Sequence, residues 1–267
     1  MMRAARRAGH GLMRRFRGRA ALRVELKGRA DFVSEADRES EDGLRDMLLG
    51  RFPRYGFLTE ESAETHGTDA RFVVDPLDGT TNFLRGIPHF AVAVALEREG
   101  SVVAGLVYDP PKDEMFVAEL RRGAWLGRER LRVSADRDFT RALVATGIPH
   151  ANARHRHGPY LAMLEEAMRE AAGIRRLAAA ALDLAYVAAG RFAVFFELGL
   201  SRWDVAAGSL LVREAGGRVT QPDGGDEYLD SGEILATNGR LHEPTLAMLR
   251  RATRRVASVS RRARRSR

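Results

Sequence analysis

The sequence contains no cysteine, although the chain has 267 residues. A disulfide-stapled scaffold, a zinc–thiolate or iron–sulfur centre and a cysteine nucleophile are therefore excluded, and any metal ligands must be oxygen or imidazole groups. No run of about 18 consecutive apolar residues occurs, and the N-terminus lacks the apolar segment of a secretory signal. Neither a membrane span nor export is indicated, and we expect a cytoplasmic protein.

The formal net charge of +8 is distributed unevenly along the chain. Residues 1–30 carry ten Lys or Arg and one acid, and residues 250–267 carry nine Arg and no acid. The segment between them therefore has a formal net charge of −10. Since the basic residues lie at the two ends, the net charge does not by itself indicate a nucleic-acid-binding body, and the acidic body suits divalent cations.

The apolar pattern divides the chain into two halves with different element types. Helices are predicted over residues 3–23 and 35–52, with Ser34 as the N-cap of the second helix. An organelle transit peptide, also rich in arginine and poor in acids, is the alternative interpretation of the first segment. Strands over residues 72–74, 91–96, 102–108 and 114–119 predict an antiparallel meander, and after residue 146 helices and strands alternate.

Length and composition allow one large domain or two fused halves. We expect one domain over residues 1–249, with an N-terminal α+β half to about residue 145 and a C-terminal α/β half over about 146–249. The arginine-rich tail, residues 250–267, is expected to begin as helix and become disordered, because like charges repel and little apolar surface remains to bury.

The most informative segment is residues 73–83, which read VVDPLDGTTNF. Two valines bring a strand to its end, a proline fixes the turn, and Asp75 and Asp78 lie three residues apart, so both carboxylates point toward one place. The following Gly79 and Thr80 resemble a helix start with exposed backbone N–H groups, where phosphate binds well. A structural turn is the simpler interpretation of Asp-x-x-Asp-Gly alone, but the full string is far more specific.

The full string resembles the signature of the inositol monophosphatase family, and three further segments match that family in the expected chain order. They are KGRADFVSEAD at residues 27–37, GFLTEES at 56–62 and WDVAAG at 203–208, continuing to EAGG at 214–217. The resemblance covers residues from about 5 to 250. It implies an αβαβα layered sandwich of the fructose-1,6-bisphosphatase type, with an antiparallel sheet in the first half and a mixed sheet in the second, and a homodimer.

The resemblance also implies a magnesium site. Glu60, Asp75 and the carbonyl of Leu77 would hold one ion, and Asp75, Asp78 and Asp204 a second, with Glu60 near a weaker third ion. Hard oxygen ligands suit Mg²⁺, which takes about six of them. Family members are inhibited by lithium.

Six residues receive the catalytic and substrate-binding roles by resemblance. Thr80 and Asp37 would activate water, with Glu60 as a further catalytic residue. Gly79 and Thr80 would bind phosphate through their amides. Glu197 would accept hydrogen bonds from substrate hydroxyl groups, and Lys27 would lie on a loop beside the substrate.

The sequence departs from the family pattern at two places. Thr59 stands where glycine is usual, and Ala178 and Ala179 replace a Gly-Ser pair. The sequence alone leaves the effect of these departures open, and extra methyl groups near residue 178 would narrow the pocket of the leaving group.

Two classes of function follow. The first is a phosphoric monoester hydrolase, with inositol 1-phosphate as the leading substrate and histidinol phosphate as the nearest alternative, ahead of fructose 1,6-bisphosphate and 3′-phosphoadenosine 5′-phosphate. The second is a binding module in which the basic ends contact RNA or an RNA-polymerase complex, as in some bacterial members of the family.

Overall fold

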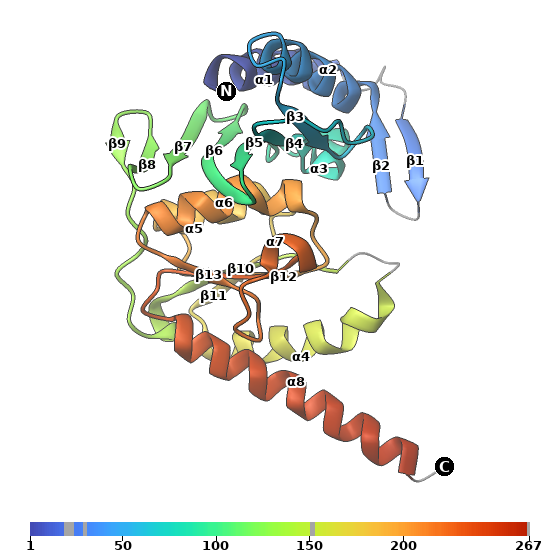
Figure 1. Cartoon of the computed structure of the whole chain (residues 1–267). Helices are drawn as coiled ribbons and strands as arrows, with labels where there is room; N and C mark the ends of the chain where they lie inside the picture. The colour runs from blue at the N-terminus through green and yellow to red at the C-terminus, as the bar shows by residue number, and fades with distance from the viewer. Residues whose placement is uncertain (19–23, 29–30, 150–152, 266–267) are drawn as a thin grey trace.

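The computed structural model describes the chain apart from residues 19–23, 29–30, 150–152 and 266–267, with backbone only at 24–28, 31–33 and 256–265. The elements stack in five layers, as Figure 1 shows. Helices α1 and α2 lie at one end, followed by a seven-stranded sheet, the pair α5 and α6, a five-stranded sheet, and helices α4 and α8. The predicted αβαβα sandwich is confirmed.

The first sheet has the strand order β3-β4-β5-β6-β7-β8-β9. Its strands span Gly56–Thr59, Arg71–Asp78, Ala91–Arg98, Ser101–Asp109, Glu114–Glu119, Gly123–Leu126 and Glu129–Arg130. The antiparallel meander expected from the sequence is present from β4 onward, but β3 runs parallel to β4. The sheet is therefore mixed, and the carboxyl ends of β3 and β4 lie at the same edge.

The second sheet has the order β11-β10-β12-β14-β13 and is mixed, as expected. Its strands are Leu143–Thr146 (β10), Gly173–Arg175 (β11), Val194–Leu198 (β12), Arg218–Thr220 (β13) and Glu233–Thr237 (β14). Strand β10 pairs parallel with β11 and β12, whereas β14 pairs antiparallel with β12 and β13. A separate hairpin joins β1 (Val24–Gly28) to β2 (Asp31–Ser34).

The helices divide the buried apolar side chains into three cores. Their bounds are Met2–Arg17 (α1), Glu35–Leu49 (α2), Thr80–Arg85 (α3), Arg154–Glu170 (α4), Ala180–Ala188 (α5), Arg202–Glu214 (α6), Tyr228–Ser231 (α7) and His242–Arg265 (α8). One core lies beneath α1 and α2, one between the sheets around α5 and α6, and one beneath α4 and α8. Among the described residues, no helix is long and apolar enough to cross a membrane.

Small residues let the central helices approach the first sheet closely. Ala91, Ala93 and Ala95 face α5 and α6, while the alternating valines of β5 face α1 and α2. At Gly105 on β6, an added Cβ atom would lie 2.7 Å from the carbonyl oxygen of Ala207 on α6. Because α6 is pressed this closely on the sheet, its N-terminus is held near the ends of β4 and β5.

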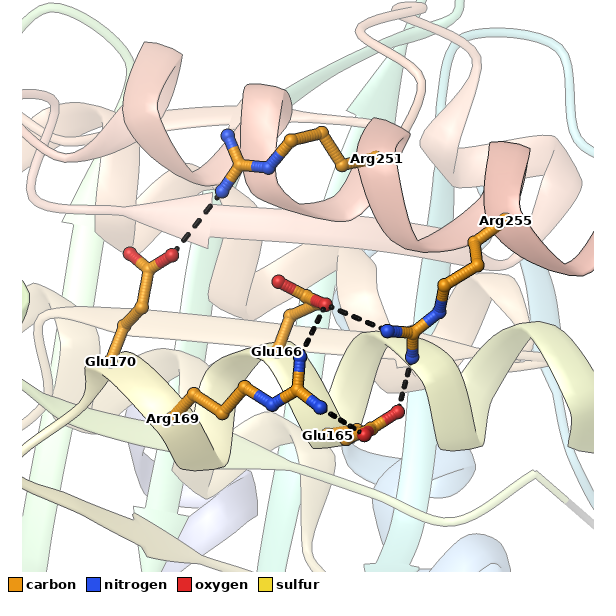
Figure 2. A network of polar contacts seen from close by, with 6 residues as sticks. All are labelled: Glu165, Glu166, Arg169, Glu170, Arg251 and Arg255. Carbon is orange, nitrogen blue, oxygen red and sulfur yellow. Dashed lines mark hydrogen bonds and ion pairs between the residues drawn. The ribbon is translucent and has the colours of Figure 1, made fainter.

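The C-terminal segment was expected to begin as helix, and the α8 backbone is helical to Arg265. The disorder expected toward its end stays a prediction. Figure 2 shows how its first part is held against α4: Arg251 pairs with Glu170, and Arg255 pairs with Glu165 and Glu166. Opposite charges on α4 offset the repulsion among the arginines of α8. Ala252 is also buried in the core beneath the helix, so apolar packing continues past Leu249.

Candidate active site

A β-bulge at the end of β4 brings Asp75 and Asp78 to one face of the first sheet. Asp75 lies opposite Ala93 and Asp78 opposite Ala91, so three steps along β4 match two along β5. Residues directly opposite each other point to the same side, and Ala91 and Ala93 both face α5 and α6. Strand β4 thus continues to Asp78, where the sequence indicated a turn, but the expected convergence of the two carboxylates is present.

Two other elements bring the remaining carboxylates to this corner. Glu60 follows the last residue of β3, and because β3 is parallel to β4 with Thr59 opposite Val74, Glu60 lies beside Asp75. Asp204 lies in the first turn of α6 and accepts a hydrogen bond from the Ser201 N–H at 2.6 Å. The negative charges that raise the pKa of Asp75 are those of Glu60, Asp78 and Asp204, after burial as the larger cause.

The donor set fits a hard cation, although the side chains do not form a closed metal cage in this conformation. Within the described residues, no group of three or more His, Asp or Glu side chains converges closely enough to count as a metal-binding set. Like charges repel, and Asp78 and Asp204 each satisfy oxygens with backbone N–H groups. Four carboxylates nevertheless share one corner of low exposure, which is the oxygen-rich environment that Mg²⁺ prefers.

Thr80 and Asp37, predicted as a pair, are in direct contact. The Thr80 hydroxyl lies 3.0 Å from Asp37 Oδ1 and 3.0 Å from the Leu77 carbonyl oxygen. Asp37 is 1% exposed, and its other oxygen accepts hydrogen bonds from the Ser34 N–H and hydroxyl at 2.8 and 2.6 Å. Burial raises the pKa of Asp37, and these hydrogen bonds oppose that increase. Ser34 is the N-cap of α2, as the sequence indicated.

The departure at Thr59 has a structural role that the sequence did not reveal. The Thr59 hydroxyl donates to Glu41 Oε2 at 3.0 Å, and the same oxygen accepts from the Glu61 N–H at 3.2 Å. Glu41 is buried on α2 and also pairs with Arg45. A glycine at residue 59 would lack this hydroxyl, so Thr59 anchors the loop that carries Glu60. The signal in the sequence is weak: Glu41 is one of two acids on the inner face of α2, with Asp37.

Asp78 also caps a helix that is distant in sequence. Its oxygens accept hydrogen bonds from the N–H groups of Ala180 and Ala181 at 3.2 and 2.9 Å, which satisfies backbone donors at the start of α5. Asn82 completes the junction by donating to the carbonyl oxygens of Leu177 and His89 at 2.8 and 2.9 Å. Asn82 belongs to the motif at residues 73–83, but the sequence indicated no role for it.

The second departure from the family pattern lies in this junction. Ala178 has a φ of +62°, in the left-handed region that favours glycine. Gly79, with a φ of +88°, faces it, and an added Cβ atom there would lie 3.3 Å from the Ala178 carbonyl oxygen. The alanine therefore occupies a strained backbone position beside the site, where the family pattern has glycine.

Glu197 lies on the opposite wall, on β12. Its carboxylate packs directly on Gly147, where an added Cβ atom would lie 1.8 Å from Oε1. Burial, and then the charges of Asp204 and Asp78, raise the pKa of Glu197 to about 8. Asp183, which no sequence pattern singled out, is a further buried carboxyl group beside Glu197, and its Oδ1 has no partner among the described residues.

Lys27 is the one predicted site residue whose side chain lies outside the described part of the chain. Its backbone belongs to β1, and residues 29–30 of the same segment also lie outside. Its predicted position beside the substrate therefore stays a prediction.

Comparisons with known proteins agree with this geometry. A model of the inositol monophosphatase family matches residues 1–254. The chain is 49% identical to an inositol-1-monophosphatase of Rhizobium meliloti over 253 residues, covering 94% of this chain and 95% of that protein. It is 43% identical to the Nus factor SuhB of Escherichia coli over 251 residues, covering 93% and 94%. A crystal structure of the extragenic suppressor protein suhB of Bartonella henselae superposes with a TM-score of 0.91 at 49% identity, covering 93% and 96%.

The family match over residues 1–254 and the relatives at about 50% identity place the chain among the phosphoric monoester hydrolases, in a family that is generally metal-dependent. More narrowly, the chain belongs to the inositol monophosphatase family.

Replacing Ala178 with glycine is expected to raise the free energy of unfolding by about 1 kcal/mol, because the left-handed conformation costs alanine about that much. Ala179→Gly is the matched control, since Ala179 has a φ of −149° and its methyl group is buried; this variant should be destabilised. Urea unfolding of both variants measures the effect. A loss of stability in Ala178→Gly equal to that of the control would contradict the assignment of strain.

The raised pKa values predict an unusual dependence of stability on pH. Burial raises the pKa of Asp78 and Asp204 to about 7 and that of Glu197 to about 8, so the folded chain holds protons that the unfolded chain releases. Without metal, the melting temperature should therefore fall as the pH rises from about 6.5 to about 8.5. The opposite contribution of the buried His89 and His242, whose pKa is about 4, lies mainly below that range.

Millimolar Mg²⁺ should displace the protons of Asp78 and Asp204 and reduce the decline. Scanning calorimetry in EDTA and in Mg²⁺ measures both profiles, and Asp204→Asn should flatten the EDTA profile. A melting temperature in EDTA that rises with pH over this range would show that these carboxyl groups are not protonated in the folded protein.

Proposed function

We propose that this protein hydrolyses inositol 1-phosphate to inositol and phosphate in a Mg²⁺-dependent reaction. The observation that carries the proposal is the contact of Thr80 with both Asp37 and the Leu77 carbonyl, at the edge where Asp75 and Asp78 share one face. The name and the 49% identity of the Rhizobium meliloti relative support inositol 1-phosphate as the substrate.

Glu60, Asp75 and the Leu77 carbonyl would hold one Mg²⁺ ion, and Asp75, Asp78 and Asp204 a second, with a third, weaker ion near Glu60. When bound, the ions supply positive charge that neutralises the phosphoryl group and the attacking and leaving oxygens. The carboxylates have to be ionised to bind them, so metal binding and proton release are coupled.

The chain's own contribution to water attack follows from the hydrogen bonds of Thr80. Its hydroxyl has one hydrogen, and the two acceptors within 3.0 Å are Asp37 Oδ1 and the Leu77 oxygen. The proton is therefore directed inward, which leaves an oxygen lone pair to accept a hydrogen bond from water. Thr80 thus orients the attacking water and Asp37 holds Thr80, while the Gly79 and Thr80 amides bind the phosphate.

Glu197 is the group that favours a polyol as the leaving group, since its carboxylate accepts hydrogen bonds from hydroxyl groups. Histidinol phosphate is the nearest alternative substrate, followed by fructose 1,6-bisphosphate and 3′-phosphoadenosine 5′-phosphate. Lithium inhibition, a homodimer, a cytoplasmic location and a contact of Lys27 with substrate belong to the same proposal.

Thr80→Ala should lower kcat by about 10²- to 10⁴-fold, the usual range for losing a group that assists proton transfer, while Mg²⁺ binding stays within a factor of about two. Thr80→Ser keeps the hydroxyl and is the matched control, with most activity retained. Phosphate release from the four candidate substrates, with and without EDTA and Li⁺, measures activity. Turnover in EDTA equal to that in Mg²⁺ would contradict the proposed reaction, and equal loss of kcat and Mg²⁺ affinity in Thr80→Ala would make Thr80 structural.

A second function rests on a different feature, the basic helix α8. Figure 1 shows this helix extending away from the rest of the chain toward the C-terminus. A 43% identical relative is named a Nus factor, and residues 256–267 carry five arginines. We propose that the C-terminal arginines bind the backbone phosphates of RNA, and that the protein has this function in addition to the hydrolase activity.

Deleting residues 256–267 should leave hydrolysis unchanged, because Ala252 and the pairs of Arg251 and Arg255 with α4 are kept. The affinity for single-stranded RNA should fall and become less dependent on salt. Each phosphate that the protein neutralises adds about 0.7 to the steepness with which the logarithm of the binding constant falls with the logarithm of the salt concentration. Salt-titrated filter binding measures this slope, and Arg122→Gln, which removes an exposed arginine elsewhere in the chain, is the control. Equal slopes before and after deletion would contradict the RNA contact.

A further inference from the structure

A buried ionic network links the start of α6 to the first sheet. Glu97 on β5 is 2% exposed, and its two oxygens bind two different arginines. Arg71 Nε, from the beginning of β4, lies 2.7 Å from Oε2, and Arg202 Nη1 lies 2.6 Å from Oε1. Because Glu97 is opposite Arg71 in the β4–β5 register, the carboxylate has a fixed place on the sheet.

Arg202 is the first residue of α6, two residues before Asp204. Its guanidinium binds Glu97 and also Asp230 of α7, so it connects the first sheet with the second half of the chain. A planar guanidinium that donates to two carboxylates fixes direction as well as distance, which a lysine ammonium group does not. Arg202 side-chain exposure is 17%, so solvent screens this contact less than an exposed pair.

The local backbone carries this constraint to the carboxylate of Asp204. Asp204 is tied to the first turn by the Ser201 N–H at 2.6 Å, so its oxygens follow the position of the helix start. Asp75 and Asp78 are fixed separately by the bulge in β4. The spacing between the two groups of carboxylates therefore depends on how α6 is placed over β4 and β5.

We propose that Arg202, anchored by Glu97, is a positioning residue that sets the distance of Asp204 from Asp75 and Asp78 and thereby the affinity of the cation they share. The inference rests on the proposed function, because it assumes that Asp204 is a metal ligand. The Arg202 guanidinium is bound to Glu97 and Asp230, so its proposed role acts through Asp204.

The direction in which one substitution changes the cation affinity distinguishes a positioning role of Arg202 from a purely electrostatic one. Arg202 is positive, so if it acted on a cation only through its charge, removing it would strengthen cation binding. If Arg202 acts through the position of Asp204, removing it weakens binding. Arg202→Gln is therefore the diagnostic variant, whereas a Glu97 variant would weaken binding in either case.

The experiment measures Mn²⁺ binding by isothermal titration calorimetry on the full chain, with the melting temperature as a second readout. We expect Arg202→Gln to raise the dissociation constant of the Mn²⁺ ion that Asp204 binds by about tenfold. This change lies within the usual range of coupling between interacting residues. Arg202→Lys should give an intermediate loss, and it keeps the measurement possible if the glutamine variant folds poorly. Arg218→Gln is the matched control, because Arg218 makes a 2.6 Å pair with Glu243 away from the site.

The same substitution in an Asp204→Asn background gives the deciding comparison. If Arg202 acts through Asp204, Arg202→Gln should cause no further loss of Mn²⁺ affinity there, while its effect on melting temperature should persist in both backgrounds. An equal loss of affinity in both backgrounds would make Arg202 a general structural residue and overturn the inference.

Two further outcomes separate this inference from the proposed function. If Asp204→Asn weakens Mn²⁺ binding but Arg202→Gln leaves it unchanged or strengthens it, the inference alone is overturned. If the unaltered protein binds no Mn²⁺, or Asp204→Asn has no effect on binding, both the proposed function and the inference are overturned.

Discussion

Four carboxylates share one corner of the structure, and the burial of Asp75 and Asp78 there is the constraint on which the surrounding structure depends. Burial and neighbouring negative charge raise the pKa of Asp75, Asp78 and Asp204 together. Such an arrangement is unfavourable for folding alone, because buried carboxylates without a cation lose hydration. The cost of burying these carboxylates is offset by hydrogen bonds from backbone N–H groups at the starts of α5 and α6 and by supporting side chains around the corner.

The layered architecture explains why neither sheet holds the site by itself. The bulge in β4 and the end of β3 supply carboxylates from the first sheet, while α6 and β12 bring Asp204 and Glu197 from later in the chain. Asp78 and Asn82 join the two parts by binding the backbone that leads into α5. A displacement of the layers would therefore move these carboxylates relative to one another.

The structure brings together the predicted Thr80–Asp37 pair and the two aspartates of β4, while most contacts that support them had no signal in the sequence. The motif around Asp75 was recognisable because the full string at residues 73–83 resembles a family signature, and the same resemblance indicated the partner segments. The parallel pairing of β3 could not be read from a four-residue strand, nor could the bulge be distinguished from a turn, since both use the same proline. Contacts such as Glu41 with Thr59, or Glu97 with Arg202, join segments far apart in sequence and leave no local pattern. The helical start of the tail was predicted, but the pairs of its arginines with acids on α4 also join distant segments and leave no local pattern.

Anomalous diffraction from crystals of the protein grown with Mn²⁺ at about pH 8, above the raised pKa values of the corner, tests the cation site most directly. We expect an anomalous peak bounded by carboxylate oxygens of Asp75, Asp78 and Asp204, with Asp75 also next to a peak beside Glu60. The Thr80 hydroxyl should stay bound to Asp37. Crystals with Mn²⁺ at other places and no peak at Asp75 would contradict the central claim that this corner is a metal-dependent phosphatase site.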